Sequence, residues 1–485
     1  MKNDSLSSKA KGGFIWKFLE KFVSTGVQFI LGIVIARIIS PDEYGIVGEL
    51  MIFTQICDVI ILQGLTSALI QKKNADQVDF SSVFFANLVV SLGLYLILVL
   101  SSPLMVTYFK EPVLKEMMPV FGLVVIVGAF GAVPNAVLSR DLDFKKSFFR
   151  NLSNYGVQAV VGIACALNGF GAWSVLWSKL SGTLVGVIVL MITVGWKPSK
   201  TFSFERIKGL FSYGSKVLVS NLLNTLFNNI QPLIVGGVFS SDMLGHYQRG
   251  QQMPSAVMSA VDGSLSEVLF PTLSNVQDQK ERLKGMMRRS MTVSMYLVFP
   301  FLLGLIAVAK PVVRVLLTDK WLPCVPFMQL TCIVCMFWPL NARTQALNAL
   351  GKSNVTMRVS IISKTLTIIM VLASIRISIY AMMISSIIAS AITFWITSYY
   401  VNKYIGYTLP EVLKDIAIPL SLSAVMAGIV YCVGFLGLSD ILTLLIQVPL
   451  GVAVYLIASK LFHVESFEYI ISMAKGLLKR KQKQA

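Results

Sequence analysis

Charged residues are scarce in this sequence, and histidine is almost absent. Of 485 residues, 14% are charged and two are histidines, whereas roughly a quarter of the residues in soluble domains are charged. The mean hydropathy is +0.72 and 55% of the residues are hydrophobic. This composition excludes a soluble globular protein, and it leaves no polar stretch long enough for a large soluble catalytic domain.

The cysteines and histidines do not follow the spacing of a metal site or of a secreted disulfide framework. The six cysteines lie in apolar runs or close to their ends, which is typical of buried small side chains. One Cys-x-x-Cys pair occurs at Cys332 and Cys335, but no second pair accompanies it, and His246 and His463 lie elsewhere. We therefore predict no metal site, no cofactor and no catalytic residue.

Long apolar runs fill most of the chain. A spanning helix takes about 20 apolar residues, and runs bounded by charge, proline or glycine predict about fourteen such helices. The expected fold is an all-α polytopic membrane protein. The expected helices cover residues 14–39, 45–70, 81–109, 117–139, 148–168, 170–196, 209–239, 243–273, 290–317, 322–350, 355–375, 377–401, 412–437 and 441–462.

Basic residues cluster in alternate connections between the predicted helices. With the N-terminus in the cytoplasm, segments such as 140–150, 275–289 and 460–485 fall on the same side and carry many of the 42 lysines and arginines. Such a bias predicts that both termini are cytoplasmic and that the number of spans is even. Topology thus accounts for the net charge of +18, and no nucleic acid partner is expected. The basic tail is expected to lie near anionic lipid headgroups.

Two connections between helices match at an offset of 200 residues, IISPDEYGIVG (38–48) and VFSSDMLGHYQ (238–248). The same offset aligns polar positions 20, 24 and 28, one helical turn apart, with positions 220, 224 and 228. Six predicted spans separate the copies, so the two halves share one orientation and form a parallel repeat. The predicted lobes are residues 1–196 and 197–401, followed by two helices and a basic tail in 402–485.

Charged side chains inside the predicted spans should face a wet cavity, because a lone charge in hydrocarbon costs about 3 kcal/mol or more. For any single serine or asparagine, hydrogen bonding between helices is the stronger explanation. Taken together, the rows of polar residues on the two repeat-related helices favour a hydrophilic cavity between two lobes. Its predicted cationic lining is Lys179, Lys216, Arg343 and Lys364, and its predicted polar lining is Ser24, Gln28, Ser220, Asn224, Asn228, Gln252, Asn341 and Gln345.

The chemistry of this lining favours a particular class of ligand. Amides and hydroxyls with scattered basic groups suit a molecule rich in hydroxyls that bears negative charge, such as a sugar chain joined to a phosphate. A pore for small cations would instead carry acidic rings. The acids Asp58, Asp262 and Glu267 either bind a coupling proton or sodium ion or pair with nearby basic residues. Both alternatives stay open.

Three segments carry a resemblance to a known family. ARIISPDEYGIVGE (36–49) looks like the first-loop signature of polysaccharide flippases in the multidrug/oligosaccharidyl-lipid/polysaccharide exporter superfamily. GHYQRGQQMPS (245–255) and the segment 269–354 resemble the branch of colanic acid and lipopolysaccharide exporters. The resemblance implies two lobes around a cationic cavity. It also implies that an undecaprenyl-diphosphate-linked oligosaccharide moves from the inner to the outer leaflet of a bacterial inner membrane by alternating access.

The sequence therefore predicts a flippase for surface polysaccharide biosynthesis rather than an enzyme. Its expected partners are a lipid-linked oligosaccharide and membrane lipids, and its expected location is the bacterial inner membrane. One alternative is a drug or small-molecule cation antiporter of the same superfamily, which the wide asparagine, serine and glutamine stripes disfavour. Another is a membrane polysaccharide polymerase or ligase. That function needs a long extracytoplasmic loop with acid or base residues, and the predicted outside connections are short.

Overall fold

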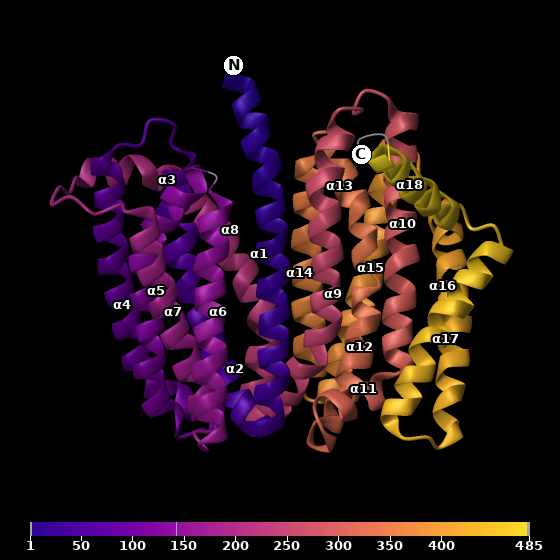
Figure 1. Cartoon of the computed structure of the whole chain (residues 1–485), viewed down its shortest axis with the longest axis horizontal. Helices are drawn as coiled ribbons and strands as arrows, with labels where there is room; N and C mark the ends of the chain where they lie inside the picture. The colour runs from indigo at the N-terminus through magenta and orange to yellow at the C-terminus, as the bar shows by residue number, and fades with distance from the viewer. Residues whose placement is uncertain (1, 142, 483–485) are drawn as a thin grey trace. The chain divides into compact units, whose positions relative to one another are not determined.

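The computed structural model describes the backbone of residues 2–141 and 143–482, and within these ranges it contains helices and no β-strand (Figure 1). The chain divides into two compact units after Gly245. Each unit is a bundle of long helices joined by short connections. The predicted all-α fold is confirmed.

The first unit contains eight α-helices and the beginning of a ninth. In this unit α6 packs between α1 and α7, α5 contacts both α4 and α7, and α8 lies against α2 and α3. A short π-helical segment, Val235–Phe239, follows α8. The helices are α1 (Lys2–Ile38), α2 (Pro41–Gln63), α3 (Leu65–Gln71), α4 (Gln77–Phe109), α5 (Leu114–Asp141), α6 (Phe144–Leu167), α7 (Ala172–Val194) and α8 (Phe204–Ile234).

The second unit continues α9 (Ser241–Ser274) and is built around α10. Here α10 contacts α16 and α18, α14 pairs with α15, and α16 pairs with α17. The helices are α10 (Lys280–Ala307), α11 (Ala309–Leu316), η2 (Asp319–Cys324), α12 (Val325–Cys335), η3 (Trp338–Asn341), α13 (Ala342–Ala349), α14 (Ser353–Ser374), α15 (Ile379–Ile405), α16 (Leu409–Val433), η4 (Gly434–Leu436), α17 (Asp440–Leu461) and α18 (Glu465–Gln482).

Eleven helical segments of the described residues are long and apolar enough to cross a membrane. Three further long helices, α6, α8 and α9, overlap predicted spans, but their described residues are less apolar than those of the eleven segments. The fourteen predicted ranges each overlap one of these fourteen long segments. Helix α18 is an addition, because only a basic tail was expected there.

Local sequence sets where the helices begin. Ser40 caps α2 together with Glu43, whose carboxylate accepts the Ser40 backbone N–H at 2.8 Å, and Pro41 occupies the first helical position. The same reciprocal arrangement joins Asp76 to Asp79 at the start of α4. These pairs satisfy backbone N–H groups that the first turn of a helix leaves without partners.

The starts of α2 and α9 contact each other through two glycines of the first unit. A Cβ atom added to Gly45 would lie 1.7 Å from the backbone oxygen of Ser241, and one added to Gly245 would lie 2.0 Å from that of Pro41. Positions 41 and 45 match 241 and 245 in the repeat. The contact of position 45 with position 241 is therefore repeated, 200 residues along, by the contact of position 245 with position 41. A two-fold axis relates contacts in this reciprocal way. This reciprocity supports the internal duplication.

The boundary of the compact units differs from the boundary between the predicted lobes. The units divide after Gly245 because α8 packs against α2, α3 and α4 of the first unit. The lobes 1–196 and 197–401, with the remainder in 402–485, were defined by the repeat and not by contacts. They stay a prediction about the duplication.

We expect Gly45→Ala and Gly245→Ala each to destabilise the protein, since the new methyl group meets backbone that cannot move aside. Overpacking of this kind costs about 1–3 kcal/mol, which corresponds to a fall in melting temperature of about 5 °C. Gly93→Ala on α4 is the matched control, because its Cβ would meet nothing within 4 Å. Thermal unfolding of the purified variants measures the difference, and equal melting temperatures for all three would contradict the close contact.

Candidate functional site

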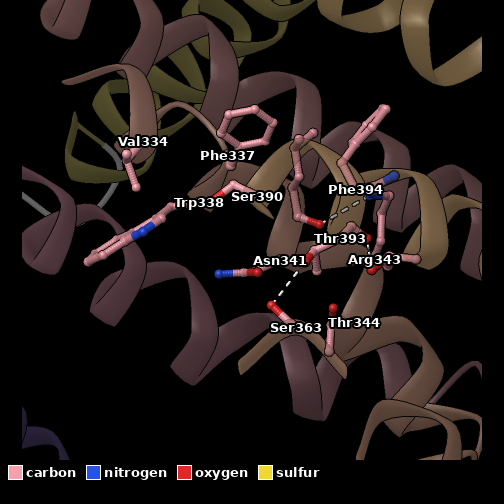
Figure 2. A pocket seen from close by; sticks show the side chains of 12 residues that line it. Val334, Phe337, Trp338, Asn341, Arg343, Thr344, Ser363, Ser390, Thr393 and Phe394 are labelled. Atoms are coloured by element: carbon pink, nitrogen blue, oxygen red, sulfur yellow. Dashed lines mark hydrogen bonds between the residues drawn. The ribbon is translucent and has the colours of Figure 1, made fainter. Parts of the chain in front are cut away.

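Two adjoining pockets in the second unit are lined by polar side chains from four elements. Each has a volume of about 210 Å³, and they share Asn341 of η3, Thr344 of α13, Ser363 of α14, and Thr393 and Thr397 of α15. Figure 2 shows the first pocket, where the Asn341 side chain extends into the space between Trp338 and Ser363. Asn341 thus lines a pocket within this unit, and its place in a substrate cavity stays a prediction.

A break in the helical run creates the pockets. The 3-10 turn Trp338–Asn341 separates α12 from α13, and Pro339 lies within it. Proline has no backbone N–H to donate and therefore disfavours a continuous helix. At this break the carbonyl oxygen of Leu340 accepts a hydrogen bond from Nε of Arg343 at 3.2 Å.

Arg343 is the buried cation of the first pocket. Its Nη1 donates to the hydroxyl of Ser398 at 2.7 Å, and its guanidinium lies 4.6 Å from the centre of the Phe394 ring. The side chain is 2% exposed. Among the described residues, no carboxylate makes an ion pair with it. A buried guanidinium that only neutral groups surround favours an anion, because charge-assisted hydrogen bonds are the strong ones.

Lys364 lines the second pocket, so the structure brings two of the four predicted cations to adjoining sites. The predicted residue Gln345 is half-buried on α13, and it is not among the residues that line either pocket. Phe337, Trp338 and Phe394 add aromatic surface to the first pocket. Both pockets thus combine a cation with hydroxyl and amide groups.

The hydroxyls of α15 were missed in the sequence. Ser390, Thr393 and Thr397 lie on one helical face and line the first pocket. Each donates to the carbonyl four residues earlier, and Thr393 is also within 2.9 Å of the Ser363 hydroxyl. The three-to-four residue spacing of Ser386, Ser390, Thr393 and Thr397 was the available signal.

In the first unit Lys179 of α7 interacts electrostatically with Asp58 of α2. Both side chains are half-buried. The sequence left open whether Asp58 binds a coupling ion or pairs with a basic residue. Lys179 is close enough to act on the charge of Asp58, and both alternatives stay predictions. Attraction between the two charges lowers the cost of placing either of them in a spanning helix.

A second polar network joins α1, α6 and α5. The Glu20 carboxylate accepts from the Asn151 amide at 2.6 Å. Arg150 donates to the Asn151 side-chain oxygen at 2.6 Å and to that of Asn135 at 2.9 Å. These groups hold the helices together. On the same α1 stripe Ser24 is half-buried, and Gln28 is exposed and hydrogen bonds with Tyr155.

Helix α8 divides its polar residues between two faces. Asn221 and Asn229 donate to Gln63 and Gln55 of α2 at 3.4 and 3.2 Å. The predicted cavity residues occupy another face, where all four side chains are exposed: Lys216, Ser220, Asn224 and Asn228. Because so many amides and hydroxyls cannot face lipid, this stripe is suited to a wet surface.

The remaining predicted site residues lie on α9. Gln252 is half-buried and accepts a hydrogen bond from Arg249, whose guanidinium lies 5.4 Å from the centre of the Trp321 ring. The side chains of Asp262 and Glu267 lie outside the described residues, so their proposed ion coupling stays a prediction. Among the described residues, no group of three or more histidine, cysteine, aspartate or glutamate side chains is arranged to hold a metal ion.

Comparison with known proteins places the chain in a family. Residues 34–326, more than half of the chain, match the family described as polysaccharide biosynthesis protein. The chain belongs to this family. Together with the eleven apolar helices, this membership identifies a multi-pass protein of a bacterial inner membrane.

Two curated relatives are named for polysaccharide synthesis. The succinoglycan biosynthesis transport protein ExoT of Rhizobium meliloti (strain 1021) is 27% identical over 63% of this chain, and the match spans 62% of ExoT, less than two thirds of its length. The lipopolysaccharide biosynthesis protein WzxC of Escherichia coli (strain K12) is 22% identical over 68% of this chain and 68% of its own length.

A solved structure shows the same fold over nearly the whole chain. The lipid II flippase MurJ in an inward closed conformation has a TM-score of 0.73 and 15% sequence identity. The likeness covers 93% of this chain and 98% of that structure. This likeness shows the fold, and the family match shows the expected relation to proteins of polysaccharide biosynthesis.

The Asp58 and Lys179 interaction makes a prediction about paired substitution. We expect Asp58→Asn and Lys179→Gln each to destabilise the protein, since each leaves one half-buried charge without its partner. The double variant should recover at least half of the lost melting temperature, because it removes both charges. Purely additive losses in thermal unfolding would contradict this interaction and would favour independent roles for the two side chains.

Proposed function

We propose that this protein moves a phosphate-bearing, lipid-linked oligosaccharide from the inner to the outer leaflet of the bacterial inner membrane by alternating access. The sugar headgroup would cross through polar surfaces of the protein while the lipid tail stays in the bilayer. No covalent bond changes in this process, so we propose a transporter and not an enzyme. The glycan would serve surface polysaccharide biosynthesis, which is supported by the names of ExoT and WzxC, since these refer to succinoglycan and lipopolysaccharide biosynthesis.

The pair of pockets in the second unit is the observation that carries the proposal. Arg343 supplies a buried positive charge, and Thr344, Ser363 and Thr393 supply hydroxyl groups. A sugar phosphate has the complementary chemistry, since its phosphate accepts from guanidinium and its hydroxyls both donate and accept. The aromatic side chains of Trp338 and Phe394 offer flat apolar surface to the C–H faces of a sugar ring.

The energetics explain why a protein path is needed. A charged phosphate and many hydroxyls lose their hydration on entering hydrocarbon, and each unpaired polar group costs several kcal/mol. The exposed α8 face with Lys216, Ser220 and Asn224 offers replacement hydrogen bonds. We propose that this face and the pockets of the second unit both contact the headgroup during transport.

Ion coupling forms a separate part of the proposal. Asp58 lies beside Lys179 in the first unit, which supports a role for Asp58 in pairing more than in ion binding. Asp262 and Glu267 remain proposed sites for a coupling proton or sodium ion. Transport by Asp262→Asn and Glu267→Gln variants, measured with and without a proton gradient, distinguishes the two ions.

Arg343→Gln should lower surface polysaccharide at least about tenfold, because the hydrogen bonds of a charged donor contribute about 1.5–3 kcal/mol. Arg343→Lys should retain part of the export, since it keeps the charge but loses the planar guanidinium. Lys216→Gln should give a smaller loss, because that side chain is exposed. Surface polysaccharide is quantified at matched protein levels.

Arg376→Gln is the matched control for this experiment. Arg376 is an exposed arginine of the same unit and does not line either pocket. Its substitution should leave export unchanged. Normal export by both Arg343→Gln and Lys216→Gln, with the proteins folded and present, would refute charge compensation by these residues.

A further inference from the structure

A third pocket lies between the N-terminal part of α10 and the start of α18, outside the site described above. Its volume is about 380 Å³. Three arginines of α10 line it, Arg282, Arg288 and Arg289, together with the hydroxyl residue Thr292. Gly285 lies among them, and a Cβ atom there would meet nothing within 4 Å. The pocket is thus open and its lining is rich in guanidinium groups.

The arginines of this pocket are held in different ways. Arg288 donates to both oxygens of Asp415 at 2.6 and 2.7 Å, so its charge is already compensated. The Arg289 guanidinium lies 4.4 Å from the centre of the Tyr469 ring of α18. Arg282 makes a hydrogen bond of 3.3 Å to the neutral Gln279 side chain.

One acid of the lining faces these cations. Glu465, at the start of α18, lines the pocket and acts electrostatically on Arg288. With Asp415 compensating Arg288, the lining still carries more positive than negative charge. The excess belongs to Arg282 and Arg289, whose side chains are both exposed. A phosphate group fits this excess, because guanidinium binds phosphate oxygens in a bidentate manner.

An apolar stripe leads away from the pocket along α10. Residues 289, 293, 297 and 301 follow one another at intervals of four and therefore share one side of the helix. Val293 is half-buried, and Leu297 and Phe301 are 50% and 45% exposed. At the adjoining end of α17, Leu461 and Phe462 are 72% and 68% exposed. Exposed apolar surface next to guanidinium groups matches the boundary between lipid tails and headgroups.

We infer that the α10–α18 pocket binds the phosphate headgroup of an anionic membrane lipid, with an acyl chain along Val293, Leu297 and Phe301. The lipid belongs to the leaflet on the side that the positive-inside bias predicts to be cytoplasmic. A free phosphate ion would use the same arginines but would have no use for the apolar stripe. This inference does not depend on which substrate the protein transports.

The test uses the full-length protein, stripped of lipid in detergent and titrated with phosphatidylglycerol while bound lipid is counted by native mass spectrometry. The double variant Arg282→Gln/Arg289→Gln should bind phosphatidylglycerol at least about fivefold more weakly, since one basic residue near a charged membrane surface changes binding by about that factor. Arg288 is left in place because it holds Asp415. Unchanged melting temperatures show that the variant is folded.

The matched control is Lys352→Gln/Lys403→Gln. Both lysines are exposed, and each lies near the ring of Tyr404 rather than in the pocket. This variant removes the same charge from the second unit and should bind phosphatidylglycerol as the unchanged protein does. An equal loss in both double variants would overturn the inference, because attraction would then follow overall charge. So would unaltered binding by Arg282→Gln/Arg289→Gln.

Further measurements in the same experiment show whether the pocket binds the phosphate of a lipid or free inorganic phosphate. Zwitterionic phosphatidylcholine should bind more weakly than phosphatidylglycerol to the unchanged protein. Leu297→Ser should weaken phosphatidylglycerol binding, and inorganic phosphate at equal concentration should not displace the lipid. Displacement by inorganic phosphate, or normal lipid binding by Leu297→Ser, would overturn the assignment to a lipid.

Discussion

The structure depends on one constraint, that hydrocarbon offers no partner to a polar or charged side chain. In the first unit this constraint is met by interactions between helices, namely the hydrogen bond between Glu20 and Asn151 and the attraction between the charges of Asp58 and Lys179. In the second unit Arg343 is surrounded by hydroxyl, carbonyl and aromatic groups without a described carboxylate partner. Polar groups that interact across helices hold the bundle together. A buried cation such as Arg343, which has only neutral neighbours among the described residues, retains its capacity to bind an anion.

The predicted internal repeat connects this chemistry to the fold. Gly45 contacts Ser241 and Gly245 contacts Pro41, so the beginnings of α2 and α9 approach each other through residues without side-chain bulk. The repeat also placed a polar stripe on each of two helices. In α1 the stripe is partly used in contacts with α6, while in α8 the matching face is exposed. Positions that the predicted repeat makes equivalent thus differ in their surroundings.

Much of the fold could be predicted from the sequence because apolar length is a one-dimensional property. The fourteen helical ranges followed from it. The assignment of Arg343, Lys364 and Asn341 to a substrate cavity rested instead on the cost of polar groups in hydrocarbon, and it stays a prediction. The interactions between charged side chains could not be predicted, because the residues involved are far apart in the sequence, as Lys179 and Asp58 are. The hydroxyls of α15 were missed because a serine or threonine that bonds to its own helix does not raise local polarity. Helix α18 was missed because its basic residues obscured its apolar spacing.

The central claim is that the protein carries the sugar headgroup of a lipid-linked oligosaccharide across the membrane. Depletion of the protein in its own cell, followed by mass spectrometry of lipid-linked saccharides with leaflet-specific labelling, tests it most directly. The account predicts that complete oligosaccharides on their lipid carrier accumulate in the inner leaflet and that surface polysaccharide falls. Oligosaccharides that still reach the outer leaflet at the normal rate, or that accumulate there without further processing, would contradict it.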